Sequence, residues 1–332
     1  MYDAPEKDGP RLALAARLTD AGDPRGEFIT LHMNRRAGKV TKREQDLEKE
    51  HGRAWLGEIE GLLEKDVVFE RGLVAEATVV GGTSGGWYYR VLPTGAGTQR
   101  EWSTLRRLTL AGHESPGLLS GARTQRIPEL FEVGRGHLNE LLKGPARPQL
   151  LRLELANARQ RSAHTGESDV LSSKLPEKFP SLESLQIGAR ADGIPGVEKL
   201  VERLPNLREL AVGSAEPELI ELVALARRRK LEKVHSLGLT DFTFTLSTGV
   251  LEIAFNGIIH PKQASIAEET LANARDLGIT RVLVRVPPRA KIEPDAKGRP
   301  AKIKRRSESL PLCPILEVVE SLGLKCEFDV AK

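Results

Sequence analysis

The chain has 332 residues, of which 39% are hydrophobic and 29% are charged. This balance is typical of folded, soluble domains and excludes a generally disordered chain. The length suits two or three packed units or one elongated repeat array. The formal net charge is +4, but residues 289–306 hold eight Lys or Arg against two acids, so the rest of the chain carries −2. The basic character is therefore local.

The chain contains two cysteines, Cys313 and Cys326, with neither a second pair nor CxxC spacing. They support neither a disulfide framework nor a structural zinc site, which indicates a reducing compartment. No stretch approaches the ~18 apolar residues that span a bilayer, and the first residues lack the pattern of an export signal. We therefore expect a cytoplasmic protein with no membrane partner, no metal and no cofactor.

A first unit, residues 1–95, is predicted to be helical with a small β element. Leu12 and Ala15 indicate one apolar helix face, and turn residues follow it at 22–26. In that turn an aspartate side chain can bond amides ahead of it while proline presets the backbone, as in Asp23-Pro24. We expect a second short helix to begin there.

Later in the same unit, Thr41 and Glu44 have the spacing of a capping box, which satisfies two amides at a helix start. Residues 66–80 change to a strand-like period with a glycine at the bend. We expect a helix after Thr41 and a pair of strands after it.

A second unit, residues 96–240, is predicted to be an irregular leucine-rich-repeat-like array of strand–helix units. Its basis is a template, LxxLxL, that recurs five times, and such units bury their apolar sides only against their neighbours. The matches are Leu105-x-x-Leu108-x-Leu110, Leu150-x-x-Leu153-x-Leu155, Leu182-x-x-Leu185-x-Ile187, Leu207-x-x-Leu210-x-Val212 and Val234-x-x-Leu237-x-Leu239. Helical periodicity follows at 197–204 and 219–225, and we expect an extra helix at 127–142.

A third unit, residues 241–332, is predicted to be a C-terminal α/β segment. Alternating residues at 242–246 and 251–255 indicate a hairpin with a three-residue loop that contains glycine. A helix at 262–277, a strand at 282–286, a helix at 315–322 and a strand at 325–330 complete it. The basic residues fall in an expected loop, 289–309. The unit is either a separate domain or the capping end of the array.

In each LxxLxL strand the residues flanking the central leucine are expected to point away from the core, because side chains alternate across a strand. In the fifth match these residues are Ser236 and Gly238. The face lacks the aromatic residues that dominate many interfaces, so a solvated face and a protein-binding face both remain open. The candidate protein-binding residues on this face are Arg107, Arg152, Glu154, Gln186 and Glu209.

The basic stretch suggests a second interpretation. Residues 302–306 read Lys302-Ile-Lys304-Arg305-Arg306 and could attract a phosphate backbone or another polyanion. The stretch also holds prolines and a glycine and no aromatic residue to stack on bases. A mobile, solvated loop is therefore the favoured reading, with nucleic-acid binding as the alternative.

The sequence offers no catalytic constellation. Gly82-Thr-Ser84-Gly-Gly86 formally matches GxSxG, but a hydrolase elbow needs a helix after the serine, and Trp87 begins a strand-like run. The seven histidines show no HExxH or paired metal-ligand spacing. We therefore expect a protein that is not an enzyme.

The first unit resembles the repeat-companion domain, a bacterial module that typically precedes leucine-rich-repeat-like segments. The resemblance rests on three stretches in the family's order, residues 18–31 with Asp23-Pro-Arg-Gly-Glu-Phe-Ile29, residues 51–57 and residues 68–74. It covers roughly residues 10–80, and it implies a non-enzymatic, repeat-bearing architecture. We predict an interaction scaffold whose partner is another protein.

Overall fold

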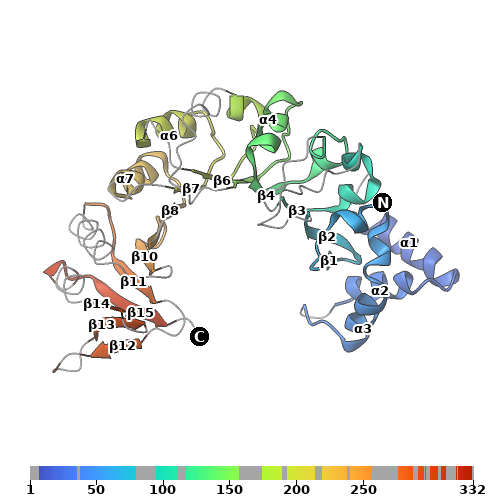
Figure 1. Ribbon diagram of the computed structural model, residues 1–332, viewed down its shortest axis with the longest axis horizontal. Coiled ribbons are helices and arrows are strands. Elements are labelled where there is room, and N and C mark those ends of the chain that lie inside the picture. The colour runs from blue at the N-terminus through green and yellow to red at the C-terminus, as the bar shows by residue number, and fades with distance from the viewer. Residues whose placement is uncertain are drawn as a thin grey trace. The chain divides into compact units, whose positions relative to one another are not determined.

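The structure is a computed structural model that divides into two compact units, Met1–Ala156 and Asn157–Lys332 (Figure 1). Both units are mixed α/β. The structure describes residues 7–35, 38–79, 95–110, 117–156, 174–188, 193–213, 219–237, 240–255, 276–286, 291–294, 296, 300–305, 308–311, 319 and 321–330.

The first unit begins with three helices, α1 (Asp8–Asp20), α2 (Pro24–Met33) and α3 (Lys42–His51), followed by the 3-10 helix η1 (Ala54–Leu62). Both predicted helix starts are confirmed. Asp23 accepts a hydrogen bond from the backbone N–H of Arg25 at 2.8 Å, and Thr41 and Glu44 form both bonds of the capping box. These local bonds satisfy amides that a helix start leaves without partners.

The apolar face predicted for α1 is wrong in one respect. Ala15 is buried, but Leu12 is 47% exposed and the neighbouring Arg11 is only 6% exposed. Arg11 and Ala15 lie one helical turn apart and therefore share the buried side. Periodicity favoured the leucine, whereas packing placed an arginine on the inner face.

An aromatic core joins the helices to the first strands. The rings of Phe28 and Trp55 have centroids 4.7 Å apart, and Phe69 meets Phe28 edge-on at 5.6 Å. Two glycines permit this packing, because a Cβ at Gly26 would meet the backbone N of Thr19 at 2.5 Å, and one at Gly72 would meet Ile29 at 2.5 Å. The three stretches that carry the family resemblance therefore pack together.

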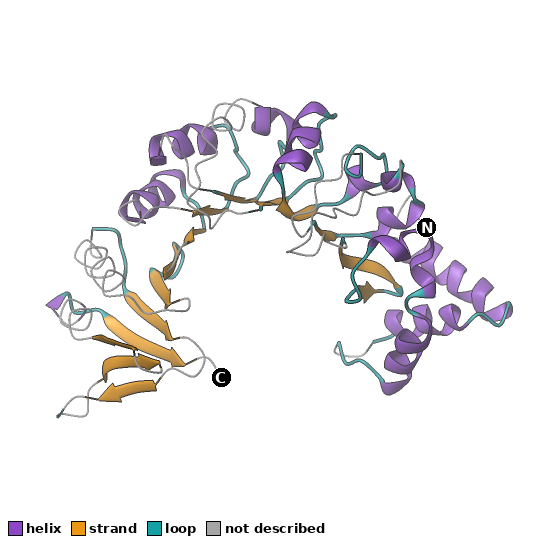
Figure 2. Cartoon of the chain, in the orientation of Figure 1, coloured by secondary structure: helices purple, strands orange, loops and turns teal. Residues whose placement is uncertain are grey.

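Five strands form the sheet of the first unit in the order β1 (Val68–Glu70), β2 (Leu73–Thr78), β3 (Arg107–Thr109), β4 (Glu129–Val133) and β5 (Arg152–Leu155). The first pair is antiparallel and the others are parallel. The 3-10 helices η2 (Ala96–Thr98), η3 (Arg100–Thr104) and η4 (Thr124–Arg126) and helix α4 (Arg135–Lys143) lie in the connections. The helices and the strands occupy opposite sides of the unit (Figure 2).

The helix expected at 127–142 is wrong in its first half, because Glu129–Val133 is strand β4 and only α4 is helical. The strand contains a bulge, with Leu130 opposite Leu153 but Val133 opposite Leu155, and Glu132 has a φ of 51°. In LxxLxL the apolar residues are separated by three and then two positions. The extra residue makes both separations three, as in Ile127, Leu130 and Val133, and this spacing resembles a helical period.

The second unit begins with parallel strands β6 (Ser184–Ile187), β7 (Glu209–Gly213) and β8 (Lys233–Leu237), which alternate with helices α6 (Gly193–Glu202) and α7 (Leu219–Arg229). Antiparallel strands β9 (Thr240–Thr245) and β10 (Val250–Phe255) follow, and β11 (Arg281–Val286) and β15 (Lys325–Val330) continue the sheet in parallel. The predicted hairpin and the last two predicted strands are confirmed. The loop of the hairpin has four residues, 246–249, instead of the expected three. The helix predicted at 262–277 lies outside the described residues, as does most of 315–322.

The fifth match to the template was placed three residues too late. Val234 pairs with Leu210, the central leucine of β7, so the unit reads Leu231-x-x-Val234-x-Ser236. Ser236, expected to face outward, is 6% exposed and occupies the third inward position. The template requires leucine or a similar residue at all three inward positions. It therefore did not match a unit that has valine and serine at two of them.

The expectation of a basic loop at 289–309 is also wrong. It contains a separate antiparallel sheet of β12 (Lys291–Pro294), β13 (Pro300–Arg305) and β14 (Glu308–Pro311). The register places Ile292 opposite Ile303, and Ile303 opposite Leu310. The prolines and charges suggested a loop, while this single cross-strand row of apolar residues provides the strand signal.

Strand pairing crosses both predicted domain boundaries. β2 pairs with β3 across the boundary after residue 95, and β8 pairs with residues 242–245 of β9 across the boundary after residue 240. The boundary between the two compact units lies instead at residue 156. The three-unit division stays a prediction.

Candidate functional site

Four charged residues of alternating sign lie side by side on strands β2 to β5. The register aligns Glu76 with Arg107, Arg107 with Glu129, and Glu129 with Arg152. Neighbouring strands are about 4.8 Å apart, so residues aligned in register share a face and come within reach of one another. We call these four residues the charge ladder.

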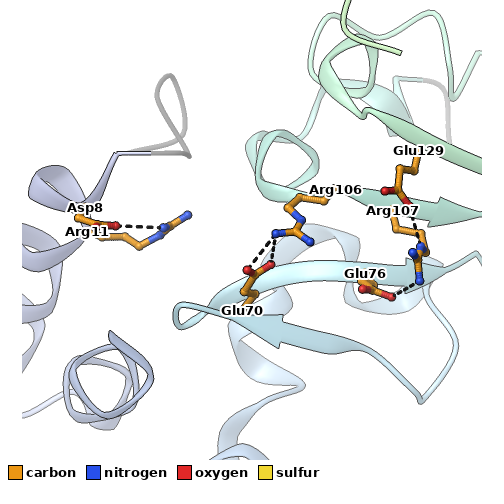
Figure 3. Close-up of polar contacts among 7 residues, drawn as sticks. All are labelled: Asp8, Arg11, Glu70, Glu76, Arg106, Arg107 and Glu129. Atoms are coloured by element: carbon orange, nitrogen blue, oxygen red, sulfur yellow. Dashed lines mark hydrogen bonds and ion pairs between the residues drawn. The ribbon is translucent and has the colours of Figure 1, made fainter. Parts of the chain in front are cut away.

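Arg107 links three strands through the ladder. Its Nε donates to Glu129 Oε2 at 2.9 Å, and its Nη1 donates to Glu76 Oε2 at 3.0 Å (Figure 3). The hydrogen bond to Glu129 raises the pKa of Arg107, and Glu76 adds to this effect. The guanidinium is thus held at two points, which fixes its position on the open side of the sheet.

An aromatic ring lies between the two arginines of the ladder. Phe131 on β4 is partly exposed, and the guanidinium carbons of Arg107 and Arg152 lie 5.0 Å and 5.2 Å from its ring centroid. Both distances are within the range of cation–π attraction. The face therefore has an aromatic anchor, contrary to the expectation that it lacks aromatic residues.

The five predicted protein-binding residues fall in both units. Arg107 and Arg152 meet around Phe131, and Glu154 lies on β5, two residues beyond Arg152. Gln186 and Glu209 lie in the second unit on β6 and β7, where Glu209 Oε2 accepts a hydrogen bond from Ser184 Oγ at 3.3 Å. All five are partly exposed.

Three of the four predicted polyanion-binding residues lie on one strand of the small sheet. Lys302, Lys304 and Arg305 belong to β13, and Lys302 is exposed. Arg306 lies outside the described residues. The register places Lys304 opposite Lys291, and Lys302 opposite Glu293.

Sequence reasoning missed three members of the site: Glu76, Glu129 and Phe131. Glu76 precedes Ala77, which takes the place of the central leucine, so β2 did not match the template. Glu129 and Phe131 were hidden by the bulge in β4. The signal that could have found them is the buried apolar spacing of Ile127, Leu130 and Val133 with one inserted residue.

A second group of charged residues in the first unit is structural. His32 and Glu44 are buried, and Arg35 bonds both, through Nη2 to His32 Nε2 and through Nε to Glu44 Oε1, each at 2.8 Å. Burial, helped by the charge of Arg35, lowers the pKa of His32 to about 4. This network joins α2 to α3, and its histidine is neutral at physiological pH.

The remaining candidates for chemistry are a metal site, the serine motif and the two cysteines, and each can be assessed only where the structure describes the residues. No group of three or more His, Cys, Asp or Glu there could hold a metal ion. The GxSxG match at 82–86 and Cys313 lie outside them, while burial raises the pKa of the Cys326 thiol to about 11. None of the described helices is both long and apolar enough to cross a bilayer.

The chain matches no protein-family model, no curated protein and no solved structure. The resemblance to the repeat-companion domain therefore stays a prediction.

Proposed function

We propose that this protein is a non-enzymatic scaffold that binds another protein on the charge ladder and Phe131. The observation that carries the proposal is the phenylalanine ring lying between two arginines, at 5.0 Å and 5.2 Å, on an open sheet face. Arginine and aromatic side chains are enriched where interfaces gain most of their energy. Ion pairs already hold Arg107, which lowers the entropy cost of ordering it on binding.

The charges on this face favour one kind of partner. Beside the ladder lies one more acid, Glu154, which is partly exposed and lies two residues beyond Arg152 on β5. The face therefore holds three carboxylates and two guanidinium groups. A partner segment with basic side chains around an apolar residue would complement both the excess acid and the ring of Phe131.

The architecture proposed for this scaffold is a leucine-rich-repeat-like array preceded by a repeat-companion-like unit. Parallel strands joined by helices in each unit support it. The inward positions of the template also support it, since Leu108, Leu153, Leu185 and Leu210 are at most 1% exposed.

The test is capture of partners from native lysate by the full chain, compared between variants. Phe131→Ala should lose the partners that the wild type recovers, while Leu12→Ala should keep them. Leu12 is a suitable control because it is an apolar residue, 47% exposed, on helix α1 of the same unit and outside the sheet. Binding of a recovered partner should then weaken at least tenfold for Phe131→Ala in a purified system.

A combined variant tests the five predicted protein-binding residues, three of which lie in the first unit and two in the second. It changes Arg107, Arg152, Glu154, Gln186 and Glu209 together, and partners that bind it unchanged would contradict the proposal.

A second candidate function is binding of nucleic acid or another polyanion to the small sheet. It is favoured by Lys304 on β13 standing opposite Lys291 on β12 and by the exposure of Lys302. Affinity for a DNA or RNA duplex should fall steeply with salt. Neutralising Lys302, Lys304, Arg305 and Arg306 should abolish it, and no binding at low salt would contradict this function.

A further inference from the structure

A pocket of about 260 Å³ in the first unit is lined by four arginines and one glutamate: Arg11, Glu70, Arg71, Arg106 and Arg126. They come from α1, from the β1–β2 hairpin, from the residue before β3 and from η4. The rest of the lining consists of apolar side chains and two hydroxyl residues. Arginines from four parts of the chain thus converge on one small cavity.

Among the residues that line this pocket, arginines outnumber acids by four to one. The lining acid, Glu70, has its Oε2 2.7 Å from Arg106 Nη1, and Asp8 lies 3.9 Å from Arg11 Nη1 (Figure 3). Asp8 also pairs with Arg71. The Arg11 side chain is 7% exposed, and a charge held away from water attracts an anion more strongly than an exposed one.

The backbone at Arg71 provides an independent observation. Arg71 and Gly72 form the turn of the β1–β2 hairpin with φ values of 52° and 78°. Such turns favour Asn or Asp followed by Gly, because few other residues adopt a positive φ without cost. An arginine in this conformation is strained, and strain of this kind concentrates at functional sites.

Arg106 is held by the sheet on both sides. Its backbone N donates to Ala75 O at 2.7 Å, and its carbonyl accepts from Glu129 N at 3.0 Å. Because side chains alternate along a strand, Arg106 lines the pocket while the next residue, Arg107, lies on the charge ladder. The pocket and the proposed protein-binding face are therefore separate sites.

We propose that this pocket binds a small oxyanion, such as a phosphate group or a compact di- or tricarboxylate. The guanidinium fork gives paired donors that match phosphate and carboxylate oxygens. The cavity is slightly smaller than the ~300 Å³ at which drug-sized sites begin, which restricts the ligand to a small molecule.

The experiment is calorimetric titration of the full chain at low salt with inorganic phosphate, pyrophosphate and citrate. These three probes separate a phosphate ligand from a carboxylate one. Arg106→Gln should weaken the best-bound probe at least tenfold, and Arg43→Gln, the control, should leave its affinity unchanged, because Arg43 pairs with Glu27 and does not line the pocket. Arg71→Asn should also weaken binding at least tenfold, because asparagine tolerates the turn but carries no charge.

Glu70→Gln should have the opposite effect. Removing the carboxylate that pairs with Arg106 should tighten binding several-fold, a result that a purely structural role for these residues would not produce. Circular dichroism and melting curves check that each variant is folded.

Two outcomes would overturn the proposal: no saturable binding of any of the three probes by the wild-type chain, or equal affinity in the wild type, Arg106→Gln and Arg71→Asn. The result is distinguishable from that of the proposed function, because Arg106→Gln should still capture the protein partner and Phe131→Ala should still bind the anion.

Discussion

In the first unit, the open row of strands β2 to β5 carries four charged residues of alternating sign beside a phenylalanine. In the second unit, the equivalent row of β6 to β8 carries Ser184, Glu209 and Lys233. The next row of the second unit contains Gln186, Ala211 and His235. Both sets of strands bury leucine at their central position, apart from Val234 on β8 and Ala77 on β2.

The comparison separates what the units share from what distinguishes them. The inward leucines are interchangeable between units because a parallel sheet covered by helices needs only apolar residues of suitable volume there. The open rows are free of this demand, so their residues differ. The first unit uses this freedom to hold fixed charges and a ring, and we therefore place the proposed binding face there.

Because both units bury leucine at the same strand position, we expect equal losses of stability when that leucine is shortened in either unit. Leu153→Ala in the first unit and Leu210→Ala in the second each remove a fully buried side chain, and each should cost about 2–5 kcal/mol in free energy of unfolding. Urea denaturation of the two variants measures this. A cost below about 1 kcal/mol for either one would show that the two central positions are not equivalent.

Acid should affect the first unit through His32, whose pKa in the folded state is about 4 because the ring is buried. The unfolded state binds the proton near pH 6.5, so the stability that His32 contributes is complete above that pH and is lost as the pH falls toward 4. Between pH 7 and pH 5 the loss should be about 2 kcal/mol.

The variant His32→Gln should therefore lose about 2 kcal/mol less than the wild type over this pH range, as measured by urea denaturation at both values. His235→Gln in the second unit is the control. His235 is partly exposed, and its Nδ1 lies 2.9 Å from Thr243 Oγ1. If His235→Gln and His32→Gln change the pH dependence equally, the contrast between the units is wrong.

The smallest effect concerns the two open rows. Glu129→Gln weakens a 2.9 Å charged bond to Arg107, whereas Glu209→Gln alters a 3.3 Å contact with Ser184. Glu129→Gln should cost about 0.5–1 kcal/mol, and Glu209→Gln less than about 0.5 kcal/mol, because both pairs are partly solvated. Raising the salt concentration should narrow the difference. An equal loss of stability in both variants would contradict the prediction that the charge ladder is held more firmly than the row of Ser184, Glu209 and Lys233.

The sequence was sufficient wherever a few neighbouring residues decide the structure. The Asp23 cap and the capping box of Thr41 and Glu44 depend on side chains that bond amides two or three residues away. The inward leucines of β3, β5, β6 and β7 followed from alternation along single strands. The mixed α/β architecture followed from the helical period of about 3.6 residues and the strand period of two residues.

Tertiary structure alone decided the features that depend on pairing between distant segments. Glu76 and Arg107 are 31 residues apart and meet only because β2 and β3 align in parallel. The bulge at Glu132 determines which residue of β4 faces the ladder. The arginine pocket likewise assembles from α1, a hairpin turn and two strand connections. A one-residue change of register reverses the face of every side chain in a strand, and local sequence patterns do not specify that register.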